Sequence, residues 1–427
     1  MREDLLHFVW KTNKLATKKL HTTSNQAIVI QTPGLHNKNA GPDFFNSKLD
    51  IEGQLWAGNV EIHLKSSDWY AHGHETDANY DNVILHVVWE DDVKVFRKDN
   101  TEIPTLELKS YIPSSLLNSY KKLLQNSKHK FINCENDFKE VDAFVVTNWL
   151  ERLYIERLEE KSKLITTLLE ESNNDWEQVL FSMLLKNFGT KVNGNSFLSL
   201  SQAINFSVVR KLQNNPIALE SVLLGMAGLL DKNEVSNAYY LQQQKEYTFQ
   251  KNKFQLESKK VLTPDFFGLR PHNFPTIRLS QLANLYGQNL NLFSKLMEFS
   301  NLEDFYALLK VKASSYWDIH YTFGKESKSS KKQTTKSFID LIIINTIVPL
   351  KFAYYKSQGK PNTNELIALL NNLKSEKNSI IQKFDAITEK TVSAFESQSK
   401  IQLYNNYCSQ NKCLQCAIGT TLLKQNS

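Results

Sequence analysis

The chain of 427 residues lacks a long apolar run, a strong excess of charge and an internal repeat of fixed period. Its most apolar stretch, Leu341–Leu350, is interrupted by Asn345 and Pro349. A membrane-spanning helix needs about 20 mostly apolar residues, so we predict a buried helix there and no membrane association. The first residues carry acids at Glu3 and Asp4 without an apolar core, which argues against a signal peptide. These absences predict a cytoplasmic protein.

The composition permits several functions and excludes one structural class. A formal net charge of +6 is small for this length, so it allows nucleic acid as a partner without requiring it. The hydrophobic content of 41%, with 24 Phe, 16 Tyr and 7 Trp, is ample for packed cores and excludes global disorder. Since a domain usually holds roughly 100–200 residues, we expect two or three domains.

The hydrophobic pattern changes character along the chain. Residues 3–14 have the apolar spacing of a short helix, and strand-like segments follow it up to about residue 115. Helical periods dominate after residue 142. We predict an α/β domain with a mixed β-sheet at 1–115, a basic linker at 116–142, and a large all-helical domain at 143–427 that ends in a cysteine cluster. The predicted fold class is therefore α+β followed by α. The expected strands are 27–32, two within 41–65, 83–89, 93–97 and 103–108.

The segment from Gly41 to Lys65 reads as two strands joined by a tight turn. Side chains alternate between faces along a strand, so Glu61, His63 and Lys65 share one face of the second strand. Antiparallel pairing brings Asp43, at the head of the first strand, toward Glu61 and His63. Two carboxylates beside a base are the groups that metal-assisted phosphodiester hydrolysis uses.

These residues predict a metal-dependent nuclease that cleaves DNA or RNA. Asp43 and Glu61 are the expected ligands of Mg²⁺ or Mn²⁺, with substrate phosphate supplying further oxygens. His63 or Lys65 is the expected base that orients or deprotonates water. Glu3, in the first turn of the first helix, is a secondary candidate ligand.

A second basic segment is a candidate for substrate binding. Arg270, His272 and Arg278 lie among aromatic residues and prolines. Cations meet phosphate and rings stack on bases, so this mixture suits a nucleic-acid strand. We expect the lysine-rich segment 325–336 to be a mobile, solvated loop, with direct phosphate contact as the alternative. The alternative is a structural loop whose arginines cap helix ends.

Two other functions stay open at this point. His72 and His74, followed by Asp77 and with His86 on the next strand, match a two-histidine-plus-carboxylate metal set of a cupin-like enzyme. The two loop histidines also have the alternative of bordering the Asp43 and Glu61 site. The other possibility is a non-catalytic scaffold that binds nucleic acid or protein.

The chain has only four cysteines, Cys134, Cys408, Cys413 and Cys416. In a cytoplasmic protein we expect them to be reduced or to hold metal, and not to form disulfides. The last three follow a C-x4-C-x2-C spacing, and Cys134 would complete a four-thiolate set for an iron–sulfur cluster or Zn²⁺. The alternative is four reduced, partly buried thiols.

The hairpin resembles the PD-(D/E)XK nuclease superfamily. Pro42-Asp43 matches the first half of that motif, and Glu61-Ile62-His63 stands where Glu-X-Lys is expected. The order helix, strand, strand, strand, loop, strand over residues 3–89 also follows the core of that fold. The resemblance implies a restriction-endonuclease-like sheet, metal ligands at Asp43 and Glu61, and an acid on the first helix at Glu3. His63 replaces the usual lysine, with Lys65 two residues on.

A second resemblance covers nearly the whole chain. It is carried by Gly41-Pro42-Asp43-Phe44, Gly58-Asn59-Val60-Glu61-Ile62-His63, Arg270-Pro271-His272-Asn273-Phe274-Pro275 and Cys413-Leu414-Gln415-Cys416. These motifs resemble a bacterial family described as domain of unknown function 2851. The resemblance implies a bacterial protein and leaves its activity open.

Overall fold

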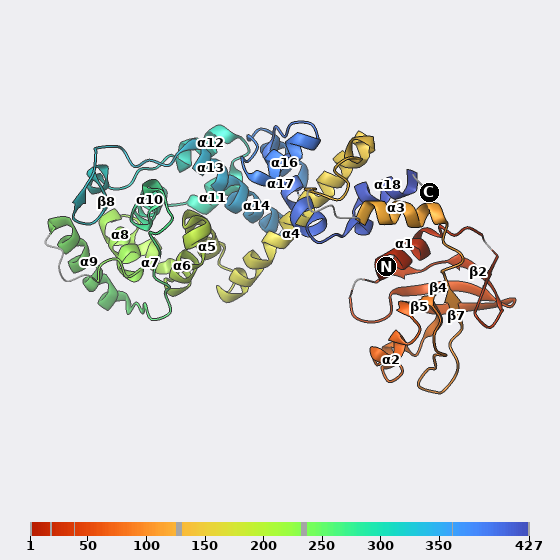
Figure 1. Ribbon diagram of the computed structural model, residues 1–427. Helices are drawn as coiled ribbons and strands as arrows, with labels where there is room; N and C mark the ends of the chain where they lie inside the picture. Colours follow the sequence, from red (N-terminus) through yellow and green to blue (C-terminus); the bar gives the residue numbers. More distant parts are fainter. Residues whose placement is uncertain are drawn as a thin grey trace. The chain divides into compact units, whose positions relative to one another are not determined.

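The computed structural model in Figure 1 divides into two compact units, which we describe separately. Unit 1 comprises Met1–Leu150, Gln382–Glu389 and Ile401–Ser427, and unit 2 comprises Glu151–Ile381 and Lys390–Lys400. The structure describes every residue except Met1, Lys18, Lys38, 125–129, 232–236, Pro361, Asn426 and Ser427.

Unit 1 is built on a mixed sheet in the order β1-β2-β4-β5-β6-β7, with the short β3 paired to β4. Neighbours from β1 to β5 run antiparallel, whereas β5, β6 and β7 run parallel. The predicted mixed sheet is therefore confirmed. The strands are Leu20–His21 (β1), Ala27–Thr32 (β2), Leu35–His36 (β3), Phe44–Ile51 (β4), Gln54–Lys65 (β5), Val83–Glu90 (β6) and Thr105–Glu107 (β7).

The predicted hairpin is present as β4 and β5. Ile51 pairs with Gln54 across a two-residue turn in which Glu52 and Gly53 both have positive φ, 53° and 82°. Such a turn matches the twist of the paired strands and fixes their register. β6 is buried at its first six positions, as expected of a strand covered on both faces. Of the two predicted edge strands, only Thr105–Glu107 forms, and Phe96 makes a single bridge to Glu102.

Helices cover this sheet and include residues from the C-terminal part of the chain. α1 packs on β5 and β6 through five buried apolar side chains, and α3 lies beside α18 (Figure 1). The helical elements of unit 1 are Glu3–Thr12 (α1), Asp68–Ala71 (α2), Ala78–Tyr80 (η1), Ser114–Leu124 (α3), Phe138–Glu140 (η2), Tyr404–Cys408 (η6), Cys413–Gln415 (η7) and Ala417–Gln425 (α18).

Unit 2 is helical apart from one small hairpin, β8–β9, and encloses a large apolar core. α4, α16 and α17 each contribute residues to both units. Its elements are Ala143–Glu171 (α4), Trp176–Phe188 (α5), Thr190–Ala203 (α6), Phe206–Leu212 (α7), Pro216–Met226 (α8), Ala238–Phe254 (α9), Pro271–Asn273 (η3), Pro275–Gln288 (α10), Leu292–Glu298 (α11), Leu302–Leu309 (α12), Ser315–Ile319 (η4), His320–Thr322 (β8), Lys325–Glu326 (β9), Lys336–Ile342 (α13), Ile343–Ile347 (η5), Val348–Ser357 (α14), Thr363–Asn371 (α15), Ser379–Ile387 (α16) and Ala394–Leu403 (α17).

The unit boundaries differ from the predicted domains 1–115, 116–142 and 143–427. The first compact unit extends to Leu150, and the C-terminal segment 401–427 groups with it instead of with the helical unit. The physical reason is the packing of α18 on α3. The predicted linker holds most of α3 and all of η2, and its residues 125–129 lie outside the described part of the chain.

The most apolar stretch lies within a helical segment, Lys336–Ser357, that is long and apolar enough to cross a membrane by length and composition. In the structure 67% of its apolar window is buried inside the protein, as the core-helix prediction required. The segment widens to a π-helical turn at Ile343–Ile347. Pro349 has no N–H to offer the Asn345 carbonyl, and Asn187 Nδ2 lies 3.4 Å from that oxygen. The cytoplasmic location stays a prediction.

Candidate functional site

Two β-bulges flank the point where β4 and β5 bring their acids together. Pairing shifts from Phe44↔Val60 to Ser47↔Gly58, so β4 carries one extra residue, and Asn46 there adopts a φ of 58°. On the other side, β6 carries an extra residue between the partners of Asn59 and Val60. Bulges re-aim neighbouring side chains and are common beside functional sites.

The side-chain carboxylates of Asp43 and Glu61 both accept hydrogen bonds from backbone N–H groups of this hairpin. The Asp43 N–H donates to Glu61 Oε2 at 3.0 Å, and the Ile62 N–H donates to Asp43 Oδ2 at 3.0 Å. Glu61 is 5% exposed. Burial raises the pKa of Glu61, the hydrogen bond from His74 lowers it, and the charge of Asp43 raises it. The carboxylates of Asp43 and Glu61 therefore each accept a backbone N–H from the opposite side of the hairpin.

Helix α1 adds two residues to this pair. His7 Nε2 lies 3.1 Å from Asp43 Oδ2. Burial alone would lower the pKa of His7, but the hydrogen bond to Asp43 and the nearby carboxylates raise it overall. The pKa of Glu3 is raised to about 7, mainly by burial. His7 acts to lower this pKa, and the charges of Asp43 and Glu61 act to raise it. Glu3 thus belongs to the same electrostatic cluster, and sequence reasoning missed His7.

Two histidines lie near the other oxygen of Glu61, and a third histidine lies beside them. Among the described residues, only His63, His72 and His74 form a group whose ligand atoms all lie within 4.8 Å of one another. Glu61 Oε1 lies 3.5 Å from His63 Nε2 and 3.4 Å from His74 Nε2. Three imidazoles and a carboxylate are a donor set for a transition-metal ion.

The surroundings of His63 prepare it to act as a ligand. Its Nδ1 lies 2.9 Å from Nε2 of the buried His86, and its Nε2 faces His72 Nδ1 at 3.2 Å. When Nδ1–H donates to His86, the Nε2 lone pair points into the histidine group, as in metal sites oriented by a second histidine contact. Burial, with the charges of His74 and His72, lowers the pKa of His63 to about 3, so the ring is neutral.

Two predicted site residues point elsewhere. Lys65 Nζ lies 3.9 Å from Asp92 Oδ2, and its side chain is 55% exposed. Asp77 Oδ1 accepts hydrogen bonds from Asn79 and caps the short helix η1. The carboxylate that lies near His63 and His74 is Glu61, and Asp77 is engaged at the start of η1.

The predicted substrate-binding residues have different environments in unit 2. Arg270 and His272 are exposed. Arg278 is 5% exposed, donates to Gln281 and Asn273, and holds its guanidinium carbon 3.4 Å from the Phe338 ring centroid. Burial lowers the pKa of Arg278 to about 9. The interpretation of Arg278 as a phosphate contact is therefore wrong, because its guanidinium is buried and bonded to neighbouring side chains.

One lysine of the lysine-rich segment is buried and hydrogen-bonded within unit 2. Lys332 is 1% exposed, and its Nζ donates to the Asp318 carbonyl at 2.9 Å and to Ser330 Oγ at 2.8 Å. This lysine is not available to phosphate. The four cysteines form a separate group in unit 1 and are treated below.

A family model described as "Protein of unknown function (DUF2851)" matches residues 3–379. The chain belongs to this family. No curated protein and no solved structure matches the chain. The match contains every acid and histidine of the site just described, whereas Cys408, Cys413 and Cys416 lie beyond its end.

In this DUF2851 protein, strand alternation correctly predicted which side chains share a face. Glu61 and His63 share a face of β5, as expected, and both reach the loop histidines. His7 gave one sequence signal: it falls one helical turn after Glu3 on the same helix. That signal acquires meaning only when α1 is packed on β5.

Proposed function

We propose that this DUF2851 protein is a metal-dependent nuclease that hydrolyses phosphodiester bonds of nucleic acid. The observation that carries the proposal is the pair of hydrogen bonds from the Asp43 N–H to Glu61 and from the Ile62 N–H to Asp43, which place both acids in one electrostatic cluster with Glu3 and His7. Clustered carboxylates of this kind repel one another, and a bound divalent cation relieves the repulsion.

The arrangement of unit 1 supports the same proposal. A helix, three antiparallel strands (β2, β4, β5), a short helical connection and a parallel strand (β6) follow one another along the chain. This is the order expected of the restriction-endonuclease-like core. In that arrangement Asp43 directly precedes β4 and Glu61 lies on the neighbouring strand β5, close to where the nuclease motif requires its two acids.

The donor atoms favour Mn²⁺ over Mg²⁺ as the cofactor. Mg²⁺ prefers oxygen ligands, whereas imidazole nitrogens suit later transition metals and Mn²⁺ accepts both donor types. Glu61 directs one oxygen toward Asp43 and the other toward His63 and His74. When bound, the ion polarises the phosphate and acidifies a water molecule.

The remaining steps fall to groups of the chain itself. Asp43 and Glu61 orient the site, and His7 accompanies Asp43 within hydrogen-bond distance. Among the described residues, His7 replaces Lys65 as the base that the geometry supports, since Lys65 Nζ faces Asp92 and His63 is committed to His86 and His72.

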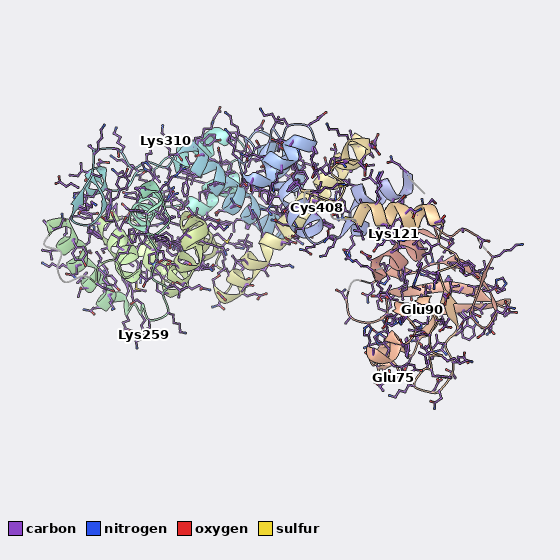
Figure 2. The ribbon with its side chains drawn as sticks, viewed as in Figure 1. Glu75, Glu90, Lys121, Lys259, Lys310 and Cys408 are labelled. Carbon is purple, nitrogen blue, oxygen red and sulfur yellow. The ribbon has the colours of Figure 1, made fainter. Side chains whose placement is uncertain are left out.

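Incubation of purified protein with labelled single- and double-stranded DNA and RNA in Mn²⁺ tests the proposal. We expect Asp43→Asn and Glu61→Gln to reduce cleavage at least about 100-fold, since even indirect loss of metal support costs 10–100-fold. Glu90→Gln is the matched control, because Glu90 is an exposed acid at the end of β6, labelled in Figure 2. Cleavage that survives both site substitutions would refute the assignment.

A second candidate function rests on the three histidines alone. His63, His72 and His74, with Glu61 in place of Asp77, form the nitrogen-rich set of a small-molecule metalloenzyme. The two proposals differ in their dependence on Asp43. Zinc or iron that is retained after purification, is lost in His72→Ala, and is unaffected by Asp43→Asn would favour the small-molecule enzyme.

A further inference from the structure

The four cysteines of the chain come from two distant segments of unit 1. Cys134 precedes η2, and Cys408, labelled in Figure 2, closes the π-helical turn η6. Cys413 opens η7, and Cys416 directly precedes α18. All four thiols are free of disulfide bonds.

Specific contacts hold the two segments together. Asn133 Nδ2 donates to Asn411 Oδ1 at 3.0 Å and lies 3.3 Å from Cys413 Sγ, across 280 residues of sequence. The ring of Phe131 stacks on Tyr404 with centroids 4.8 Å apart. The neighbour of Cys134 thus hydrogen-bonds to the thiol of a second cysteine.

The C-terminal turn is packed to keep its two cysteines close. A Cβ added at Gly419 would lie 2.3 Å from the Cys413 carbonyl oxygen, so only glycine allows α18 this approach. The Cys416 N–H donates to the same carbonyl at 3.2 Å. This geometry fixes Cys413 and Cys416 on one turn, which Asn133, the residue before Cys134, contacts at Cys413.

The sulfur atoms are supplied with hydrogen-bond donors. Cys416 receives the backbone N–H groups of Ile418 and Gly419 at the start of α18, and Cys413 receives Asn133. Donors directed at sulfur stabilise a thiolate more than a thiol, and they accompany thiolate ligands of metals.

We propose that Cys134, Cys408, Cys413 and Cys416 bind a metal centre through four thiolates. Zn–S bonds of about 2.3 Å place the sulfurs of a single zinc ion roughly 3.8 Å apart. Within the described chain no three cysteine sulfurs lie within 4.8 Å of one another. A [4Fe–4S] cluster, in which each thiolate binds a different iron, accepts sulfurs farther apart than a single zinc ion does.

The centre would act as a clamp on unit 1. It joins the segment after α3 to the segment before α18. The first segment precedes unit 2 in the sequence, and the second follows it. This role does not depend on the nuclease proposal, because none of the four cysteines lies among the acids and histidines of that site.

The test is metal analysis of the full chain purified anaerobically. We expect about one centre per chain, measured as iron with acid-labile sulfide or as zinc, and its loss to background in Cys408→Ser and Cys413→Ser. Gln410→Ala, an exposed position between them, is the control and should keep the metal. Iron with visible absorption identifies a cluster, and zinc without it identifies a single ion; either supports the thiolate centre.

A second measurement covers the case in which the serine variants do not fold. Native wild-type protein is alkylated before and after removal of metal by a chelator, and modified cysteines are counted by mass spectrometry. Protection of all four thiols that ends with metal removal supports the proposal. Wild-type protein without iron or zinc, or with disulfides between these cysteines, overturns it.

Discussion

Replacing His86 by Gln is expected to make the sheet of unit 1 less sensitive to acid. His86 is fully buried, and burial lowers its pKa well below the usual 6.5, with the charges of His63 and His74 adding to the effect. The folded state therefore keeps this ring neutral, whereas the unfolded chain protonates it below pH 6.5. The unfolded state binds more protons, so the stabilisation is complete above pH 6.5 and is lost as the pH falls.

The size of the effect follows from the pKa difference. Protonating one histidine of unperturbed pKa 6.5 in the unfolded chain at pH 5 favours unfolding by about 2 kcal/mol, at 1.36 kcal/mol per pKa unit. Glu3, Glu61 and His7 have raised pKa values and act in the opposite direction on acidification. These groups are present in wild type and in His86→Gln, so their contributions cancel when the two proteins are compared.

The free energy of local opening of β5 and β6 is measured by hydrogen exchange of peptides from these strands. The exchange is measured at pH 7 and pH 5 in EDTA and is corrected for intrinsic rates. The drop between the two pH values should be about 2 kcal/mol smaller in His86→Gln than in wild type. The Gln side chain keeps an acceptor for His63 Nδ1 without titrating. His21→Asn, at an exposed histidine, should leave the drop unchanged. Equal drops in wild type and His86→Gln would refute the reasoning.

Two further predictions concern unit 2. Arg278→Met should destabilise unit 2 by about 3 kcal/mol, because it removes buried hydrogen bonds and the contact with Phe338, yet it should not change nucleic-acid affinity. Thermal unfolding and binding titrations check this, and a folded variant with weakened binding would contradict it. Gly225→Ala should cost about 1–3 kcal/mol, because the added Cβ would lie 2.2 Å from the Tyr247 ring. An unchanged melting temperature would show that α8 and α9 separate freely.

Local rules in the sequence were enough to predict the hairpin and the shared face of Glu61 and His63. The turn at Glu52 and Gly53 fixes the register, and alternation then places Glu61 and His63 on one face. Gly225 of α8 is likewise a small residue at a close helix contact, where the Tyr247 ring of α9 lies against it. In each case the interacting residues are near in sequence or lie on paired elements.

Contacts between distant segments could not be predicted in this way. His74 reaches Glu61, and His72 reaches His63, only because α2 and the following loop fold back on β5. The ring of His74 also stacks on Tyr80, with centroids 3.7 Å apart. A basic residue such as Arg278 looks the same in sequence whether it faces solvent or a core phenyl ring. Burial decides between these outcomes, and burial depends on the complete fold.

The division of the chain has a consequence for how the protein is made. Unit 1 is interrupted by unit 2, and its last segment, 401–427, is translated only after every residue of unit 2. During translation the N-terminal sheet is therefore complete before α18 exists, and the helical unit is synthesised and folds in between. Over that interval the face of α3 that α18 covers stays exposed. Nascent chains of this protein are expected to need chaperone protection over that interval, and the sheet unit to mature last.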